Sequence, residues 1–208
     1  MATAHVTLGA ARADGSAVNS RFVRTAGGVW RIDCCTGPQL AHLPTATYRV
    51  PSEAMLPTLE LGALVTVDNA AMRARPPRLG EIVVFHPPTG AGATVPRCGA
   101  PGEGAGWKRM CGVSTRSPLT DVFIKRVVGL PGDRLSLRGG HVIRNGRPEP
   151  EGYVTPCQPA SLRDCNFPQS IVLGAGEYFV LGDNRGVSDD SRFWGPIKRG
   201  WVTGVVVR

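Results

Sequence analysis

The stretch FIKRVVGLPGD, residues 123–133, combines a strand pattern with a turn. Phe, Ile and Val fill most of its first half, and a Pro-Gly pair ends the run. Because side chains alternate between the two faces of a strand, Phe123, Lys125 and Val127 share one face. Arg126 points to the other face. The sequence therefore places a lysine among apolar neighbours.

Short β-branched or alternating runs of the same kind recur from Tyr48 to the end of the chain, separated by turn residues. The 208 residues include 27 Gly and 18 Pro, which favours turns over helices. We therefore predict a mostly β fold of antiparallel sheets, with one short helix at most, in NAAMRAR at 69–75. The runs are TYRV, ALVTVD, EIVVFH, FIKRVVGL, DRLSL, HVIRNG, EYFVLG and WVTGVVVR.

The composition changes along the chain and predicts its organisation. Residues 1–46 are rich in Ala, Gly and Arg and carry no motif that indicates a role. Residues 47–208 hold the strand runs and are predicted to form one domain. Two stretches are predicted to be loops: 87–118, a Gly- and Pro-rich insertion, and about 150–170. LRGGHVIRNGRP, residues 137–148, has two turn signals around a short strand and predicts a hairpin.

The net charge of +8 is compatible with binding to nucleic acid or to an anionic membrane surface. The arginines are spread from Arg12 to Arg208, and no zinc-finger, RNP or helix-turn-helix pattern accompanies them. We therefore expect no nucleic-acid binding. No stretch approaches the ~18–20 apolar residues that span a bilayer, and the N-terminus lacks the basic start and apolar core of a secretory signal. We expect no transmembrane anchor in this chain.

Four cysteines form two closely spaced pairs, Cys98 with Cys111 and Cys157 with Cys165. Each pair closes a short loop in Gly- and Pro-rich surroundings, as local disulfides in an oxidising compartment do. Neither pair has the C-x-x-C spacing of a zinc site. Disulfides are the favoured interpretation and free thiols the alternative. We expect no metal site and no cofactor.

Lys125 is the first candidate for chemistry. A lysine on an apolar face loses the hydration of its charged form, so its pKa falls and its neutral amine can act as a base. The alternative is a lysine that extends from a strand edge to solvent. Arg126, on the opposite face, is predicted to take part in a structural ion pair.

The second candidate is GDNRGVSDDSRFWG, residues 182–195. Its Gly, Asp, Asn, Ser and Arg residues favour a turn with many bonds from side chain to backbone, and such a rigid turn often supports a site. An ordinary polar loop is the alternative. The four histidines are scattered among turn residues and offer no Ser/His/Asp arrangement.

Three blocks stand in a fixed order: PSEAMLPTL at 51–59, FIKRVVGLPGD at 123–133 and GDNRGVSDDSR at 182–192. Together they resemble the characteristic boxes of bacterial type I signal peptidases, which are serine/lysine endopeptidases. The resemblance covers roughly residues 47–208. It implies an antiparallel β catalytic domain at the extracytoplasmic face of the plasma membrane, lying against the membrane surface. It also implies that the substrates are exported preproteins, bound as extended strands and cut at A-x-A sites, with small residues at P1 and P3.

The first box of the family reads P-S-x-S-M-x-P-T-L, and its second serine is the nucleophile. In this chain Met55, Pro57, Thr58 and Leu59 set the register, so Ala54 occupies the nucleophile position. By the same resemblance Ser52 corresponds to a hydroxyl of the oxyanion hole and Lys125 to the general base. The other implied roles are orientation of the lysine by Ser188, an ion pair between Asp190 and Arg192, structural support from Asp183 and Arg126, and substrate contact at Pro51 and Met55.

Alanine has no hydroxyl, so the resemblance implies an inactive chain. Ser52 would lie ~6–7 Å away in an extended strand, and we do not expect it to substitute. Because Lys125, Ser188 and Ser52 are all retained, we favour a recent or engineered Ser→Ala change over a naturally inactive relative. The runs MLPTLELGALV at 55–65 and FWG at 193–195 are candidates for an exposed apolar surface against the membrane.

Two alternative functions are weighed. The first is a non-catalytic peptide-binding or assembly protein that keeps the groove. The second is a self-cleaving repressor, which would need an N-terminal helix-turn-helix, and residues 1–46 show too little helical periodicity for one.

Overall fold

The computed structural model describes residues 45–93 and 97–207, together with the backbone of four short strands nearer the N-terminus. The chain divides into two units, Met1–Leu43 and Pro44–Arg208. The rest of the N-terminal segment, to which the sequence assigns no role, lies outside the described residues. In the first unit β1 (Ala10–Ala11) pairs antiparallel with β2 (Ala17–Val18), and β3 (Arg21–Arg24) with β4 (Trp30–Asp33).

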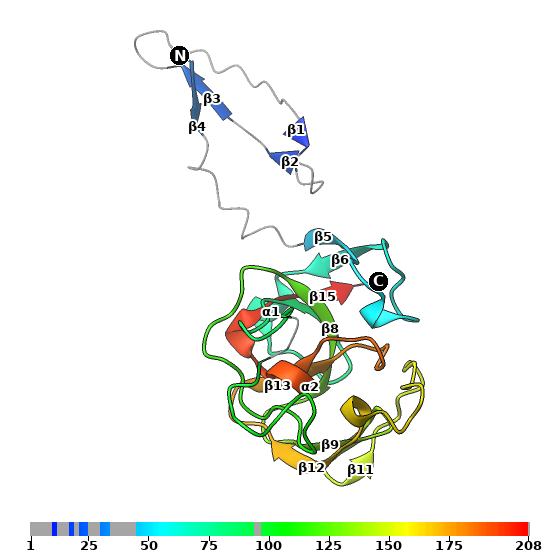
Figure 1. Ribbon diagram of the computed structural model, residues 1–208. Coiled ribbons are helices and arrows are strands. Elements are labelled where there is room, and N and C mark those ends of the chain that lie inside the picture. Colours follow the sequence, from blue (N-terminus) through cyan, green and yellow to red (C-terminus); the bar gives the residue numbers. More distant parts are fainter. Residues whose placement is uncertain are drawn as a thin grey trace. The chain divides into compact units, whose positions relative to one another are not determined.

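The second unit is built on a seven-stranded sheet in which every neighbouring pair is antiparallel. The strand order is β14-β13-β8-β7-β15-β6-β5, so β8 lies inside the sheet. β5, β6 and β15 lie at one end of the unit (Figure 1). The strands are β5 (Thr45–Arg49), β6 (Leu64–Asp68), β7 (Ile82–Phe85), β8 (Phe123–Gly129), β13 (Glu177–Leu181), β14 (Ile197–Lys198) and β15 (Val202–Val207).

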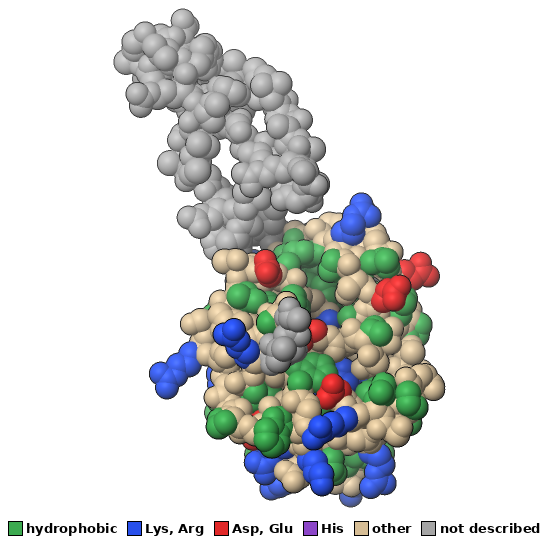
Figure 2. All heavy atoms as spheres, in the orientation of Figure 1, with side chains coloured by type: hydrophobic (Ala, Val, Ile, Leu, Met, Phe, Trp, Pro, Cys, Tyr) green, Lys and Arg blue, Asp and Glu red, His purple; other side chains and the backbone are tan. Residues whose placement is uncertain are grey.

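A four-stranded antiparallel sheet of order β11-β10-β9-β12 forms the other end of the unit (Figure 1). Alternation in β9 buries Leu135 and Leu137 and leaves Arg134 and Arg138 exposed. Lys and Arg side chains gather at this end of the face shown in Figure 2. The strands are β9 (Arg134–Arg138), β10 (His141–Arg144), β11 (Arg147–Pro148) and β12 (Phe167–Val172).

The mostly β, antiparallel fold expected from the sequence is confirmed, and so is the hairpin at 137–148, whose turns are Gly-Gly and Asn-Gly. The loop predicted at about 150–170 is wrong at its end, because β12 begins at Phe167. A proline inside β12 hides the strand pattern, and the sheet accommodates it because β12 is an edge strand.

Apolar residues of the second unit pack into three clusters that meet at β8. Val127 belongs to the first cluster, Val128 to the second and Ile124 to the third. β8 is therefore covered on both faces, and Lys125 between these residues is enclosed.

The helices are short. α1 (Ala71–Ala74) falls in the predicted NAAMRAR segment. α2 (Ser191–Trp194) lies inside GDNRGVSDDSRFWG, residues 182–195, where the sequence predicts a turn and no helix. The 3-10 turns within residues 45–93 and 97–207 are η2 (Glu53–Met55), η3 (Arg163–Cys165) and η4 (Arg199–Trp201). Among the described residues, no helix has both the length and the apolar character needed to span a bilayer.

The expected apolar surface is found only in part. Leu61 and Leu64 are 57% and 65% exposed. The FWG run does not contribute as expected: Trp194 is fully buried with its ring 6.0 Å from that of Phe85, and the half-buried Phe193 packs 6.5 Å from Phe167. These aromatic rings hold α2 to the core.

Candidate active site

Position 54 lies in η2, the single 3-10 turn that follows Ser52. Ala54 is 6% exposed, and the neighbouring Met55 packs with Ile124 of β8 in the third cluster. This apolar anchor brings η2 into contact with β8. Ser52 is exposed and extended, and its hydroxyl does not cap the turn. The exposed Pro51 precedes it. The turn is thus closed from solvent at Met55 and open at Ser52.

Lys125 reaches the site from β8, where it pairs with Val83 of β7. Its side chain is buried, with Nζ 5.7 Å from the ring centre of Phe123. Burial lowers the pKa of the Lys125 amine below its usual value, and the negative charges of Asp190 and Asp189 oppose this effect only partly. The charged form of this amine is therefore less favourable than that of a solvated surface lysine.

Gly182 lies across the strands from Lys125, because Leu181 of β13 pairs with Arg126 of β8 and the strands are antiparallel. A Cβ added at Gly182 would stand 2.2 Å from Ser188 Oγ and 2.4 Å from the carbonyl oxygen of Ala54. Both distances are far below van der Waals contact, so only glycine fits. The carbonyl of Ala54 and the Ser188 hydroxyl are therefore close neighbours beside Lys125.

The Ser188 hydroxyl is buried and makes no hydrogen bond of normal geometry within the described residues. It lies near the Asp190 carboxylate. Burial raises the pKa of Asp190, but the charge and hydrogen bond of Arg192, with smaller contributions from Lys125 and Ser188, lower it overall. The hydroxyl is thus a buried polar group with bonding capacity to spare, and among the described residues no hydrogen bond joins it to Lys125.

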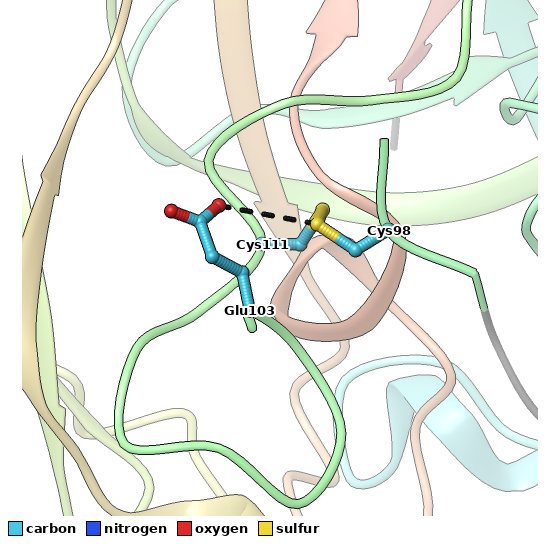
Figure 3. Close-up of side chains that lie close together, drawn as sticks. All are labelled: Cys98, Glu103 and Cys111. Carbon is cyan, nitrogen blue, oxygen red and sulfur yellow. Dashed lines mark hydrogen bonds between the residues drawn. A yellow bond between two sulfur atoms is a disulfide. The ribbon is translucent and has the colours of Figure 1, made fainter. Parts of the chain in front are cut away.

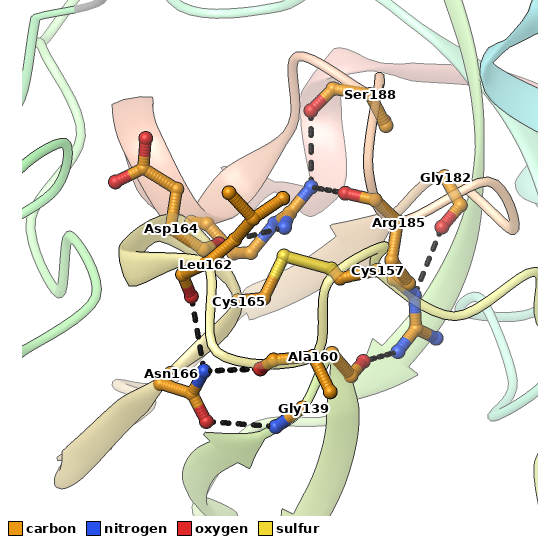
Figure 4. Close-up of a disulfide and its surroundings, with 12 residues drawn as sticks. Gly139, Cys157, Ala160, Leu162, Asp164, Cys165, Asn166, Gly182, Arg185 and Ser188 are labelled. Carbon is orange, nitrogen blue, oxygen red and sulfur yellow. Dashed lines mark hydrogen bonds between the residues drawn. A yellow bond between two sulfur atoms is a disulfide. The ribbon is translucent and has the colours of Figure 1, made fainter.

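Arg192 and Asp190 form a buried ion pair, with Nε 2.8 Å from Oδ1. The same guanidinium donates to the carbonyl oxygens of Ser188 at 3.0 Å, Arg185 at 2.8 Å and Asp164 at 2.8 Å. Asp190 also caps α2 by accepting from the Arg192 backbone N–H at 3.2 Å. These bonds fix the backbone on both sides of Ser188, and part of the network is seen in Figure 4.

A second ion pair joins the three sequence blocks. Arg126 donates to Asp183 at 2.8 Å and 2.6 Å, and Asp183 accepts from the Thr58 hydroxyl at 2.5 Å. The ring of Tyr153 stacks on the Arg126 guanidinium, with 4.0 Å between the ring centre and the guanidinium carbon. Burial raises the pKa of Tyr153 to about 12, so the phenol is neutral at physiological pH.

Sequence reasoning missed the buried ion pair of Arg185 with Glu151, whose Nη2 and Oε1 are 2.7 Å apart. Arg185 also donates to the carbonyl oxygens of Gly182 and Gly140 (Figure 4). These bonds link residues 182–190, called the polar turn below, to the hairpin at 137–148. Arg185 lies in the block at 182–192, but Glu151 lies in a Pro- and Glu-rich stretch whose sequence does not indicate a buried ion pair. Asn184 belongs to the polar residues for which 182–195 was singled out, but its contact with η2 was missed: its backbone N–H donates to the Ala54 carbonyl at 3.0 Å.

Both predicted disulfides are present, Cys98–Cys111 and Cys157–Cys165. The second closes a loop against the polar turn (Figure 4). Within that loop, the Cys165 carbonyl accepts from the Gly140 N–H at 2.7 Å, next to the Asp164 carbonyl that Arg192 binds.

The first disulfide lies beside Glu103, with Cys98 Sγ 3.9 Å from a carboxylate oxygen (Figure 3). A disulfide sulfur is not a thiolate, so this group is a poor metal ligand set while the disulfide is intact. Its loop, between β7 and β8, is attached to α2 by the Cys111 N–H, which donates to the carbonyl oxygen of Arg192 at 2.9 Å. No helix or strand is assigned in the described part of this loop, residues 86–93 and 97–122.

Comparison with known proteins identifies the family. Residues 38–208 match the family described as signal peptidase, peptidase S26, and the chain belongs to this family. It is 36% identical over 159 residues to a signal peptidase I of Leptolyngbya laminosa, covering 76% of this chain and 64% of that protein. It is 35% identical over 146 residues to a probable signal peptidase I-1 of Synechocystis, covering 70% of this chain and 61% of that one.

The chain thus spans less than two thirds of these two relatives. A solved structure of a signal peptidase I from Enterococcus faecalis aligns with 64% of this chain and 98% of its own, with 26% identity and a TM-score of 0.41.

Proposed function

We propose that residues 47–208 form a signal-peptidase-type endopeptidase domain in which residue 54 is the nucleophile position and Lys125 the general base. The observation that carries the proposal is the meeting of the Ala54 carbonyl and the Ser188 hydroxyl at Gly182, directly across the strands from the buried lysine. The Ser188 hydroxyl, which has no hydrogen-bond partner among the described residues, would orient the amine, and the Asp190–Arg192 and Asp183–Arg126 pairs hold the turn.

The chemistry follows from these positions. A serine at residue 54 would attack the scissile carbonyl carbon while its proton passes to the neutral Lys125 amine. The resulting ammonium would return a proton to the leaving amine, and water would hydrolyse the acyl-enzyme by the same route. Ala54 has no Oγ, so the first bond cannot form. We therefore infer that the chain with Ala54 does not cleave peptides through an acyl-enzyme.

The oxyanion of the tetrahedral intermediate needs hydrogen-bond donors that point toward it. The N–H of Ala54 and the Ser52 hydroxyl fit this role, because neither donates to an acceptor among the described residues. Each such donor typically stabilises the transition state by ~3–4 kcal/mol.

The proposed substrates are exported preproteins with small residues at P1 and P3, bound as an added strand near Pro51 and over the buried Met55. The domain would act at the extracytoplasmic face of the membrane. The two disulfides fit an oxidising compartment, and exposed Leu61 and Leu64 fit a membrane contact.

A second candidate function is favoured by the absence of a hydroxyl at Ala54. It is a non-catalytic peptide-binding or assembly protein that keeps the peptide-binding groove of the family. It differs from the first in one consequence, because restoring a serine would then produce no cleavage.

The test is the Ala54→Ser variant, assayed with a preprotein that carries an A-x-A site. We expect cleavage at that site, and no cleavage by the chain with Ala54 or by the double variant Ala54→Ser/Lys125→Ala. A folded Ala54→Ser variant that binds the preprotein but leaves it intact would refute the peptidase proposal and support the binding protein.

A further inference from the structure

Asn184 holds two consecutive carbonyl groups of η2. Its backbone N–H donates to the oxygen of Ala54 at 3.0 Å, and its side-chain amide donates to the oxygen of Glu53 at 3.3 Å. Glu53 and Asn184 are 131 residues apart in the sequence, so these bonds join two distant segments of the chain. The polar turn therefore controls the backbone of residues 53 and 54 directly.

The second bond acts on a particular peptide unit. The carbonyl of Glu53 and the N–H of Ala54 belong to the same planar trans peptide, so they point in opposite directions. The Glu53 oxygen also accepts from the Leu56 N–H at 3.1 Å, so the Asn184 amide is its second donor. Donors that fix this oxygen on one side of the peptide fix the direction of the Ala54 N–H on the other. They also polarise the peptide, which makes the N–H a stronger donor.

Asn184 is well placed to hold this peptide because its neighbours are immobilised. Asp183 is ion-paired with Arg126, and Arg185 with Glu151. The Asn184 side chain itself is half-buried and lies between these two anchors. The Asn184 side chain thus lies at the surface of the site, on a backbone that the two neighbouring ion pairs hold in place.

We propose that Asn184 is a positioning residue that aims and polarises the backbone N–H of residue 54 toward the oxyanion of the reaction. The proposal rests on the proposed function for its catalytic meaning, but the effect on the Glu53–Ala54 peptide holds in the chain as it stands. Asn184 does not touch the substrate in this role.

The kinetic test compares Ala54→Ser with Ala54→Ser/Asn184→Ala. We expect kcat to fall about 10- to 100-fold with little change in KM, because the bond matters most when the oxyanion forms. Affinity for a peptide boronate, which forms a tetrahedral adduct, should fall with kcat. Affinity for the product peptide should not. Unchanged kcat and boronate affinity would overturn the proposal, as would an equal loss of affinity for boronate and product peptide.

A matched control is Asn145→Gly in the same Ala54→Ser background. Asn145 also makes two side-chain hydrogen bonds, to Asp133 and to the Arg134 N–H, but in a remote hairpin turn where its φ of 53° suits glycine. This variant should lower stability without changing kcat or boronate affinity. A fall in kcat and in boronate affinity as large as the one caused by Asn184→Ala would refute a specific role.

A second measurement does not depend on activity. In the chain with Ala54, the amide ¹⁵N and ¹H resonances of Ala54 should shift on Asn184→Ala and stay in place on Asn145→Gly. If they do not shift on Asn184→Ala, the proposal is wrong whatever the kinetics. If they shift but Ala54→Ser does not cleave, the proposed function fails while the positioning of this N–H stands.

Discussion

Arg126 and Asp183, 57 residues apart in the chain, form a buried two-bond ion pair at 2.8 Å and 2.6 Å. Asp183 is fully buried, and it also accepts from the Thr58 hydroxyl at 2.5 Å. One carboxylate thus joins all three sequence blocks of the proposed site.

Arg126→Met should destabilise the fold, because it leaves the Asp183 carboxylate buried without its cation. The expected loss is about 3–5 kcal/mol in the free energy of unfolding. Denaturant titration measures it, with Arg134→Met on the exposed face of β9 as the control. The control should stay within about 0.5 kcal/mol. Equal effects of the two substitutions would show that the ion pair does not hold the fold.

Gly182→Ala should disturb the site through sterics alone, since the new Cβ meets Ser188 Oγ at 2.2 Å and the Ala54 carbonyl at 2.4 Å. In the Ala54→Ser background we expect a drop in kcat of at least about 100-fold. Gly186→Ala is the matched control, because its Cβ meets only Cys157 Cα, at 3.9 Å. Comparable rates for the two alanine variants would contradict the close packing at Gly182.

The sequence predicted the strands well where their side chains alternate or are β-branched. It placed Lys125 on the face of β8 that packs into the first cluster with Val127. Local pattern was enough there, because one strand determines which way its own side chains point.

It failed where distant contacts decide the outcome. Trp194, expected at the surface, is buried because Phe85 of β7 lies opposite it. The pairing of Arg185 with Glu151 was also missed, since two charges 34 residues apart carry no mark of their proximity. Likewise, nothing local indicates that Asn184 reaches Glu53 and Ala54.

Lys125→Met should stabilise the protein at neutral pH, because burial penalises the charged form of the lysine and methionine has no charged form. The folded-state pKa of Lys125 is lowered from 10.5, so the unfolded chain binds more protons between the two pKa values. The penalty is complete below the folded pKa and vanishes as pH rises toward 10.5. The advantage of the variant should therefore shrink at alkaline pH, as measured by denaturant titration. A constant advantage would contradict the lowered pKa.

The same amine should set the acid limb of the pH–rate profile of Ala54→Ser, with kcat/KM rising as Lys125 loses its proton. The negative charge of Asp189 raises the pKa of Lys125. Asp189→Asn should therefore move the limb to lower pH. Glu149→Gln, in the remote hairpin region, should leave it in place. A limb that moves to higher pH in Asp189→Asn would contradict this electrostatic account.

The central claim is that residue 54 is the nucleophile position and Lys125 its base. Intact-protein mass spectrometry of Ala54→Ser, mixed with an activated ester of an A-x-A peptide, tests it most directly. We predict one added acyl group, mapped to position 54, and none in Ala54→Ser/Lys125→Ala or in the chain with Ala54. A folded Ala54→Ser protein that gains no acyl group, or gains it equally without Lys125, would contradict the account.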